Sequence, residues 1–236
     1  MGHEPEDILW VLSHMRSGST VFHHILISHP EILGRGERNA HYASELDLDW
    51  LVLDTRLYQR ELFGGGRYVA DQINHDRFLP REQLLTHPRV RPIFLIRKPE
   101  PALASMVAVL GQHYGLTLQQ ALAYYEDRLS GLARYARVLG ADKPALVLTY
   151  EELVQDTAAS LARARRFLDL QSPLSDSYVQ QRFTGSAGDP SVFIRSGRVQ
   201  EARGSHDIVI PAPVRARAQE AYDACRDAFG VLRVGV

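Results

Sequence analysis

A short polar segment, residues 13–20, carries the residue types of an anion-binding loop. It reads Ser-His-Met-Arg-Ser-Gly-Ser-Thr, so that hydroxyl groups and one glycine surround Arg16. A guanidinium group can pair its planar N–H donors with the oxygens of a phosphate or sulfate. Main-chain N–H groups add donors when such a loop opens a helix. The segment therefore predicts an anion site, and the alternative is an ordinary Ser-Gly turn that caps a helix.

The same segment differs from the phosphate loop of nucleoside triphosphatases. In the pattern Gly-x-x-x-x-Gly-Lys-Ser/Thr, Ser13 would replace the first glycine and Ser19 would replace the lysine. That lysine reaches the terminal phosphates of ATP. We therefore expect an anion other than ATP, and a diverged P-loop nucleotide kinase or NTPase stays as the alternative.

The elements around this loop predict how it is held. Residues 8–12 form an apolar run typical of a buried parallel strand, and apolar residues then recur at helical spacing until His29 and Pro30. Further strands are predicted at 67–70, 92–96 and 145–148, and further helices at 99–110, 118–139, 151–170 and 211–229. This alternation predicts an α/β fold with a central, mostly parallel β-sheet flanked by helices and a P-loop-like strand–loop–helix at the N-terminus. Ligands of such sheets bind at the carboxyl ends of the strands.

Composition limits the class of protein. With 236 residues, of which 45% are hydrophobic and 23% charged, the chain suits one globular domain spanning 1–236. A net charge of −1 argues against nucleic acid as a partner. The single cysteine, Cys225, excludes an internal disulfide, and no apolar run reaches the roughly 20 residues of a membrane-spanning helix. We expect a cytoplasmic protein with no membrane span, and residues 171–207 are expected to be a long functional loop or disordered.

Two motifs together resemble those of sulfotransferases that use 3′-phosphoadenosine 5′-phosphosulfate (PAPS). The run from Arg16 to Thr20 is similar to the family's loop for the 5′-phosphosulfate, and Arg97 with Ser105 eight positions later is similar to its 3′-phosphate motif. The resemblance implies that PAPS is bound without a metal, and no His-Glu-x-x-His pattern points to one. The cofactor-binding residues that it implies in these motifs are Arg16, Ser17, Gly18, Ser19, Thr20, Arg97 and Ser105.

Two later stretches resemble the family more sparsely. Tyr150 begins a Tyr-Glu-Glu-Leu segment similar to a strand end that lies near the adenine in the family. Gly188-Asp189-Pro190 and the arginines that follow resemble a loop that closes over the 3′-phosphate. The resemblance makes Tyr150 and Arg198 further cofactor-binding candidates, with Arg195 and Arg203 beside Arg198.

The acceptor hydroxyl needs a base, which the family usually supplies from the loop after its second strand. Here that stretch is residues 70–75, in which His75 is the first candidate and Asp71 the second. The ordinary pKa of histidine, about 6.5, suits proton removal near neutrality. Residues of the polar region after the first helix stay open as alternative bases: Glu37, His41 and Glu45. Arg16 is the candidate to stabilise charge on the leaving phosphate.

The resemblance implies a sulfotransferase that moves a sulfuryl group from PAPS to a hydroxyl of a small-molecule or carrier-bound acceptor. The other product is 3′-phosphoadenosine 5′-phosphate (PAP). A nucleotide-binding module that senses such nucleotides without catalysis is a further alternative, which only turnover distinguishes. Candidate acceptor-lining residues are aromatic: Tyr42, Trp50, Tyr58, Tyr114, Tyr124 and Tyr125. The acceptor itself and the oligomeric state stay open.

Overall fold

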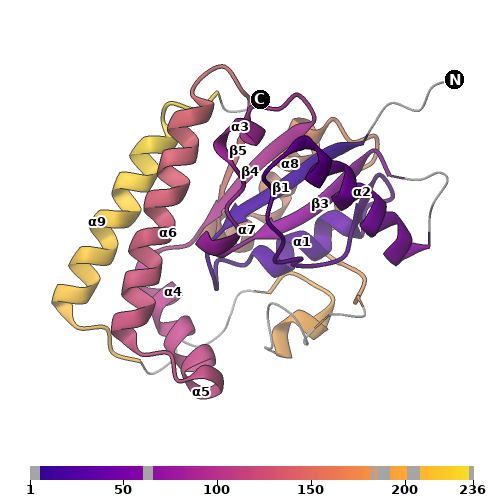
Figure 1. Cartoon of the computed structure of the whole chain (residues 1–236). Helices are drawn as coiled ribbons and strands as arrows, with labels where there is room; N and C mark the ends of the chain where they lie inside the picture. Colours follow the sequence, from indigo (N-terminus) through magenta and orange to yellow (C-terminus); the bar gives the residue numbers. More distant parts are fainter. Residues whose placement is uncertain (1–5, 61–65, 182–183, 185–191, 201–207, 234–236) are drawn as a thin grey trace, which may run out of the picture.

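A five-stranded parallel β-sheet forms the centre of the structure (Figure 1), a computed structural model that describes residues 6–60, 66–181, 184, 192–200 and 208–233. The strand order is β2-β3-β1-β4-β5, and each neighbouring pair is parallel. The strands are β1 (Asp7–Ser13), β2 (Ile32–Gly34), β3 (Tyr68–Ile73), β4 (Val90–Ile96) and β5 (Leu146–Thr149). The predicted fold class is therefore confirmed.

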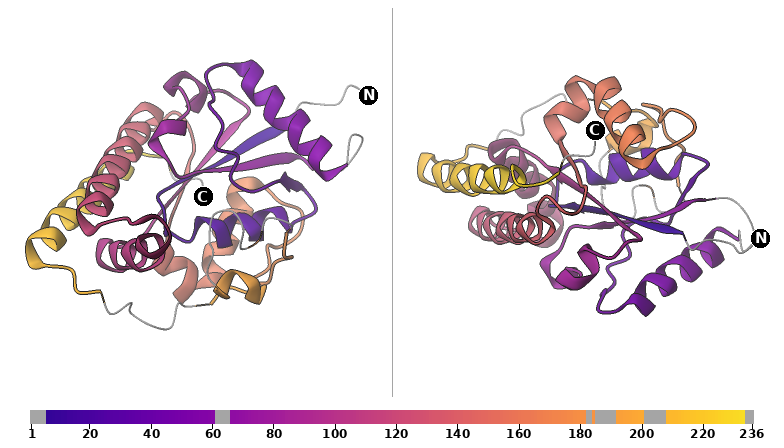
Figure 2. Two further views of the ribbon diagram at one scale, coloured as in Figure 1. Left: turned by 60° about the horizontal axis from the view of Figure 1, so that its bottom comes forward. Right: turned by 90° about the horizontal axis from the view of Figure 1, so that it is seen from above.

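Helices cover both faces of this sheet (Figure 2). The α-helices are α1 (Ser19–Ile27), α2 (Glu45–Gln59), α3 (Glu82–Leu85), α4 (Pro99–Ser105), α5 (Gly111–Tyr114), α6 (Leu118–Leu139), α7 (Tyr150–Gln155), α8 (Thr157–Leu168) and α9 (Ala212–Phe229). Short 3-10 turns form η1 (Asp76–Phe78) and η3 (Val192–Ser196), and a π-helical turn, η2 (Met106–Leu110), joins α4 to α5. Buried side chains of α1, α7 and α8 pack on one face of the sheet, and those of α2, α3, α6 and α9 pack on the other.

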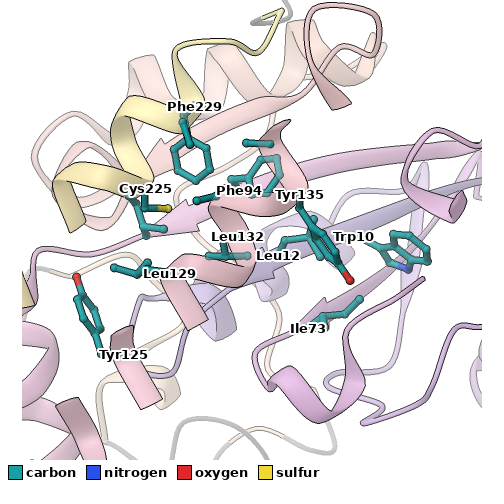
Figure 3. Close-up of a cluster of buried hydrophobic side chains, with 14 of the residues drawn as sticks. Trp10, Leu12, Ile73, Phe94, Tyr125, Leu129, Leu132, Tyr135, Cys225 and Phe229 are labelled. Atoms are coloured by element: carbon teal, nitrogen blue, oxygen red, sulfur yellow. The ribbon is translucent and has the colours of Figure 1, made fainter. Parts of the chain in front are cut away.

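Alternation along β1 explains why its whole length is apolar. Trp10 and Leu12 point to the face covered by α6 and α9, where Phe94 and Phe229 pack with ring centroids 4.9 Å apart (Figure 3). Leu9 points to the opposite face, toward α1 and α8. A central parallel strand is buried on both faces, so a continuous hydrophobic run is what such a strand requires.

Several predicted elements agree with the structure. The predicted helix 118–139 coincides with α6, whose Thr117 hydroxyl accepts from the N–H of Gln120 at its first turn. The predicted strands at 8–12, 92–96 and 145–148 correspond to β1, β4 and β5. These elements have strong local periodicity, which is why sequence alone located them.

Other elements differ from prediction. The strand predicted at 67–70 continues to Ile73, so Asp71 lies inside β3 and not in the loop after it. The helix predicted at 151–170 is two helices, because Asp156 ends α7 and caps α8 by accepting from the N–H of Ala159. Strand β2 and helix α2 were not predicted. Three residues are too few to show a period, and α2 alternates acidic and apolar side chains at its start.

The chain order identifies one special position in the sheet. From β1 the chain passes through α1 to β2 and β3 on one side, and it then returns past β1 to build β4 and β5 on the other. The loops after β1 and β4 therefore leave the sheet in opposite directions. Open α/β sheets bind their ligands at such a topological switch point.

Candidate active site

The loop between β1 and α1 has two residues in left-handed backbone conformation. Arg16 has φ 62° and Gly18, the N-cap of α1, has φ 87°. A left-handed arginine costs about 1–3 kcal/mol of strain, which persists only when the surrounding structure holds it. The conformation turns the chain sharply into α1, so that loop amides and the first turn of the helix face the same region.

Hydrogen bonds join this loop to the second predicted anion motif. The Nε of Arg16 donates to Oγ of Ser105 at 3.0 Å. The Nη1 of Arg97 donates to the carbonyl oxygen of Arg16 at 3.0 Å. Tertiary structure therefore brings together two arginines and a serine that lie 81 and 89 residues apart in the chain. We call Arg16, Arg97 and Ser105 the arginine cluster.

Tyr150 packs between Arg97 of this cluster and Gly18 of the loop. The guanidinium carbon of Arg97 lies 4.0 Å from the centroid of the Tyr150 ring. On the loop side, a Cβ added at Gly18 would lie only 2.6 Å from Cδ2 of that ring. A glycine at position 18 thus permits both the left-handed turn and the close approach of Tyr150. The adenine contact expected for Tyr150 stays a prediction.

Ser17 has a buried hydroxyl group without a hydrogen-bond partner among the described residues. Its side chain is fully buried, and its Oγ has no hydrogen-bond partner among the described residues. A buried hydroxyl without a partner is costly, and an oxygen of a bound anion would satisfy it. Ser19 and Thr20, the other predicted hydroxyls, occupy the first turn of α1.

A neutral histidine ties the ends of β1 and β4 to each other. The Nδ1–H of His14 donates to the carbonyl oxygen of Met15 at 2.8 Å, and its Nε2 accepts from the N–H of Arg97 at 2.9 Å. Burial lowers the pKa of His14 to about 3, which agrees with this tautomer. The hydroxyl of Tyr125 donates to the carbonyl oxygen of Arg97 at 2.7 Å, so this tyrosine braces β4.

The first candidate base, His75, lies beside Glu37. Its Nε2 is 3.7 Å from Oε1 of Glu37, and the side chains are 40% and 10% exposed respectively. Burial raises the pKa of the Glu37 carboxyl to about 7 and lowers the pKa of His75 below its ordinary 6.5. Near neutral pH the pair therefore holds an uncharged imidazole next to a carboxyl group at its titration midpoint. We call these two residues the proton-accepting pair, after the role that the resemblance predicts for His75.

Asp71, the second candidate base, is engaged elsewhere. Its side chain is buried in β3, where its two carboxylate oxygens accept from the hydroxyl of Tyr42 at 2.5 Å and from the N–H of Arg38 at 3.2 Å. Burial raises its pKa to about 6. Both partners belong to the segment that carries Glu37. The geometry favours Asp71 as an anchor for that segment, which corrects the prediction of an accessible loop carboxylate.

Asn74, which sequence reasoning did not assign, and Tyr124 connect the loop between β1 and α1 to the proton-accepting pair; we call this loop the phosphate loop, after the role that the resemblance implies. Oδ1 of Asn74 accepts from the hydroxyls of Ser13 and Ser19, the latter at 3.3 Å. The hydroxyl of Tyr124 accepts from the N–H of Met15 at 2.8 Å and donates to the carbonyl oxygen of Asn74 at 2.6 Å. Tyr124 thus joins the two loops, and its expected place in an acceptor site stays a prediction. A polar residue directly after a buried strand was the available signal for Asn74.

Other predicted residues lie elsewhere. Glu45 faces His87 at 3.5 Å, close to the amino end of β4, and so lies away from the carboxyl ends of the strands. Arg198 is exposed, and its described contacts are with Ser196 and with Ser177, near the carboxyl end of α1. Of the other predicted late-loop residues, Arg195 lies in η3, whereas Gly188, Asp189, Pro190 and Arg203 fall outside the described residues.

Two features are absent from the described residues. In that part of the chain no three His, Cys, Asp or Glu side chains gather as a metal site would need. No helix in the described ranges is long and apolar enough to cross a membrane.

Comparison with known proteins identifies the fold. The sulfotransferase domain of the Synechococcus PCC 7002 olefin synthase superposes with a TM-score of 0.65 at 19% identity, covering 94% of this chain and 96% of that one. The sulfotransferase domain from the curacin biosynthetic pathway gives 0.56 at 16%, covering 94% and 98%. Mouse sulfotransferase SULT7A1, complexed with PAP, gives 0.56 at 14%, covering 95% and 89%. The chain has the sulfotransferase fold.

Sequence comparison alone does not reach this result. No protein-family model matches the chain, and no curated protein sequence matches it. In this sulfotransferase fold, the arginine cluster lies after β1 and β4, at the switch point of the sheet, and the proton-accepting pair lies beside the end of β3. The arrangement can hold an anionic group between fixed cations and can accept a proton close by.

Proposed function

We propose that this protein is a sulfotransferase that transfers the sulfuryl group of PAPS to a hydroxyl of a small-molecule or carrier-bound acceptor. The arginine cluster carries the proposal, because Arg16, Arg97 and Ser105 are joined by hydrogen bonds of 3.0 Å. Two cationic groups held together suit a ligand with two anionic ends, as PAPS has. The buried, unpartnered hydroxyl of Ser17 adds a donor at the same loop.

The reaction requires one bond to form and one to break. The acceptor oxygen attacks sulfur, the bond from sulfur to the 5′-phosphate oxygen breaks, and PAP leaves with the electron pair of that bond. Negative charge grows on the bridging oxygen, where Arg16, Ser17 and the amides at the start of α1 would stabilise it. Donors that are already oriented need no reorganisation during the reaction, which is how such a loop lowers the barrier.

The acceptor proton goes to the proton-accepting pair. His75 is held uncharged by burial, and an uncharged imidazole can take a proton from the hydroxyl. Glu37, 3.7 Å from its Nε2, would stabilise the imidazolium that results once the carboxyl is ionised. Because the pKa of Glu37 is about 7, the rate should rise with pH through neutrality.

The fold supports this assignment, since one similar structure is described as complexed with PAP. Two others are named as domains of an olefin synthase and of the curacin pathway, which supports testing biosynthetic intermediates among the hydroxyl acceptors. PAPS is expected to bind without a metal, because arginines and main-chain amides supply the positive potential.

Calorimetric titration with PAP in the absence of metal tests the proposal, with ATP plus Mg²⁺ as the rival ligand. We expect PAP to bind tightly and ATP weakly, and Arg16→Ala or Arg97→Ala to weaken PAP binding by roughly 10- to 100-fold. Arg137→Ala, an exposed arginine on α6, is the matched control and should leave the affinity unchanged. Preference for ATP with Mg²⁺ would favour the diverged kinase, and PAP binding without turnover of any acceptor would favour a nucleotide sensor.

A further inference from the structure

Arg128 is a buried arginine that the proposed chemistry does not use. It lies on α6 with its side chain 0% exposed. Its guanidinium makes three contacts: Nε donates to the carbonyl oxygen of Ser13 at 2.7 Å, Nη2 donates to that of Ile73, and Nη1 pairs with Oδ1 of Asp76 at 3.1 Å. A buried charge is costly unless such partners satisfy it, so a specific arrangement holds this one.

The three partners of Arg128 lie where β1 and β3 end and the two loops of the site begin. Ser13 is the last residue of β1, directly before the phosphate loop. Ile73 is the last residue of β3, two positions before His75, and Asp76 directly follows His75. In the sheet, β1 and β3 still pair at Leu12 and Ile73. Beyond that pair the sheet no longer joins the two strands, and the guanidinium joins them from α6, beside the links through Asn74 and Tyr124.

We propose that Arg128 is a positioning residue that fixes the phosphate loop and the proton-accepting pair relative to each other, a placement that we call their register, and that supplies the buried positive charge beside His75. The proposal rests on the proposed function, since it assigns the two loops to cofactor binding and proton transfer. A planar guanidinium suits this task because it offers donors in several fixed directions at once, which a lysine ammonium on a flexible stem does not.

Charges from several elements act on the proton-accepting pair. His75 faces Glu37 from the segment after β2, Asp76 and Arg77 from η1, and Arg128 from α6. Burial has the largest effect and lowers the pKa of His75. The positive charges of Arg128 and Arg77 lower it further, whereas the negative charge of Asp76 raises it. The pKa of Glu37 is raised by burial and by the negative charge of Asp71 in β3. It is lowered by the hydrogen bond from Gln72 and by the positive charge of Arg128.

These opposite signs allow a test that needs no acceptor. Diethylpyrocarbonate reacts with uncharged imidazole, so the pH dependence of His75 modification reports the pKa of that residue. Trypsin releases residues 68–77 as one peptide in which His75 is the only histidine, so mass spectrometry can follow this site alone. We expect Arg128→Gln to raise the midpoint and Asp76→Asn to lower it. Asp127→Asn, an exposed change on the same helix, should leave the midpoint as in the wild type.

A second measurement tests the register. Arg128→Lys keeps the positive charge but loses the planar guanidinium with its several donors. The His75 midpoint should therefore stay near that of the wild type. PAP affinity should fall about tenfold, because the phosphate loop is displaced. A midpoint that moves in the same direction in Arg128→Gln and Asp76→Asn, or not at all, would overturn the electrostatic part. Unchanged PAP affinity in Arg128→Lys would overturn the register.

The Arg128 variants remove a buried side chain, and some of them can fail to fold. If circular dichroism shows that Arg128→Gln does not fold, Arg128→Met replaces it, because an apolar side chain of similar length removes the charge without leaving a buried polar group, and the His75 midpoint should again rise. Asp76→Asn, at a partly exposed residue, tests the opposite sign. If the wild type binds no PAP, the proposed function fails, but the His75 midpoints still decide whether Arg128 acts on this residue. The two failures are therefore distinguishable.

Discussion

Gly18→Ala is the change from which the structure predicts most. The new methyl group would lie 2.6 Å from the ring of Tyr150, at a residue with φ 87°. The left-handed backbone costs an alanine about 1–2 kcal/mol, and displacing a packed ring typically costs about 1–3 kcal/mol more. We therefore expect the free energy of unfolding to fall by about 3 kcal/mol. Displacement of Tyr150 also removes the surface on which Arg97 stacks.

The chain offers a matched control for this prediction. Gly115 has φ 67°, and a Cβ there would meet nothing within 4 Å, so Gly115→Ala carries the backbone cost without the clash. Urea unfolding of both variants separates the two costs, and calorimetry gives their PAP affinities. We expect Gly18→Ala to lose tenfold or more in PAP affinity and Gly115→Ala to keep it.

Two results would refute this reasoning. Equal destabilisation by the two glycine substitutions would mean that Tyr150 does not pack on Gly18 as described. Normal PAP affinity in Gly18→Ala would mean that the order of Gly18, Tyr150 and Arg97 is not needed for the anion site. In the double variant Gly18→Ala/Tyr150→Ala, removal of the ring should recover the part of the stability lost to the clash.

Three further predictions concern buried titratable groups. Burial lowers the pKa of His14 and of His23 to about 3. Between pH 6.5 and 3 the unfolded chain therefore binds protons at these two residues and the folded chain does not. Their contribution to the free energy of unfolding should be full above pH 6.5 and should fall as the pH is lowered. Each residue contributes at most about 1.4 kcal/mol per pH unit, and His23→Leu should remove one such contribution from unfolding curves measured between pH 6 and 4. For Glu37 the sign is opposite, because its pKa rises to about 7: stability present below about pH 4.5 is lost as the pH rises through 7. Glu37→Gln should therefore be more stable than the wild type at pH 8 and less active, and a lower stability at that pH would contradict the burial of this carboxyl. Asp71→Ala should cost about 1–3 kcal/mol by leaving Tyr42 without its acceptor, whereas unchanged stability with lost turnover would restore Asp71 as a base.

The local parts of the site could be predicted from sequence. An apolar run followed by a Ser-Gly loop and an apolar helical pattern predicts the strand, loop and helix around Arg16, because strand and helix periodicities are short-range signals. Arg97 and Ser105 were predicted from the resemblance to PAPS-dependent sulfotransferases, and the periodicity added only that one follows a strand and the other lies within the next helix. The parallel arrangement also followed from the alternation of strands and helices.

The buried polar residues could not be predicted in the same way. Asp71 looks like a loop residue, and the structure places it inside β3 because Tyr42 and Arg38 satisfy its carboxylate. Arg128 looks like an ordinary charged position of an amphipathic helix, yet it is buried among carbonyl groups that lie 55 and 115 residues away. The sequence pattern of α6 does not predict these two carbonyl groups as partners.

Sequence by itself determined the strands and helices with strong periodicity and the loop chemistry between them. Only the tertiary structure decided that Arg16 reaches Ser105, that Glu37 meets His75, and that Arg128 joins both loops. The physical reason is the range of the forces involved. Backbone periodicity acts over a few residues, whereas the cost of burying a polar group is offset only by partners that folding brings from distant parts of the chain.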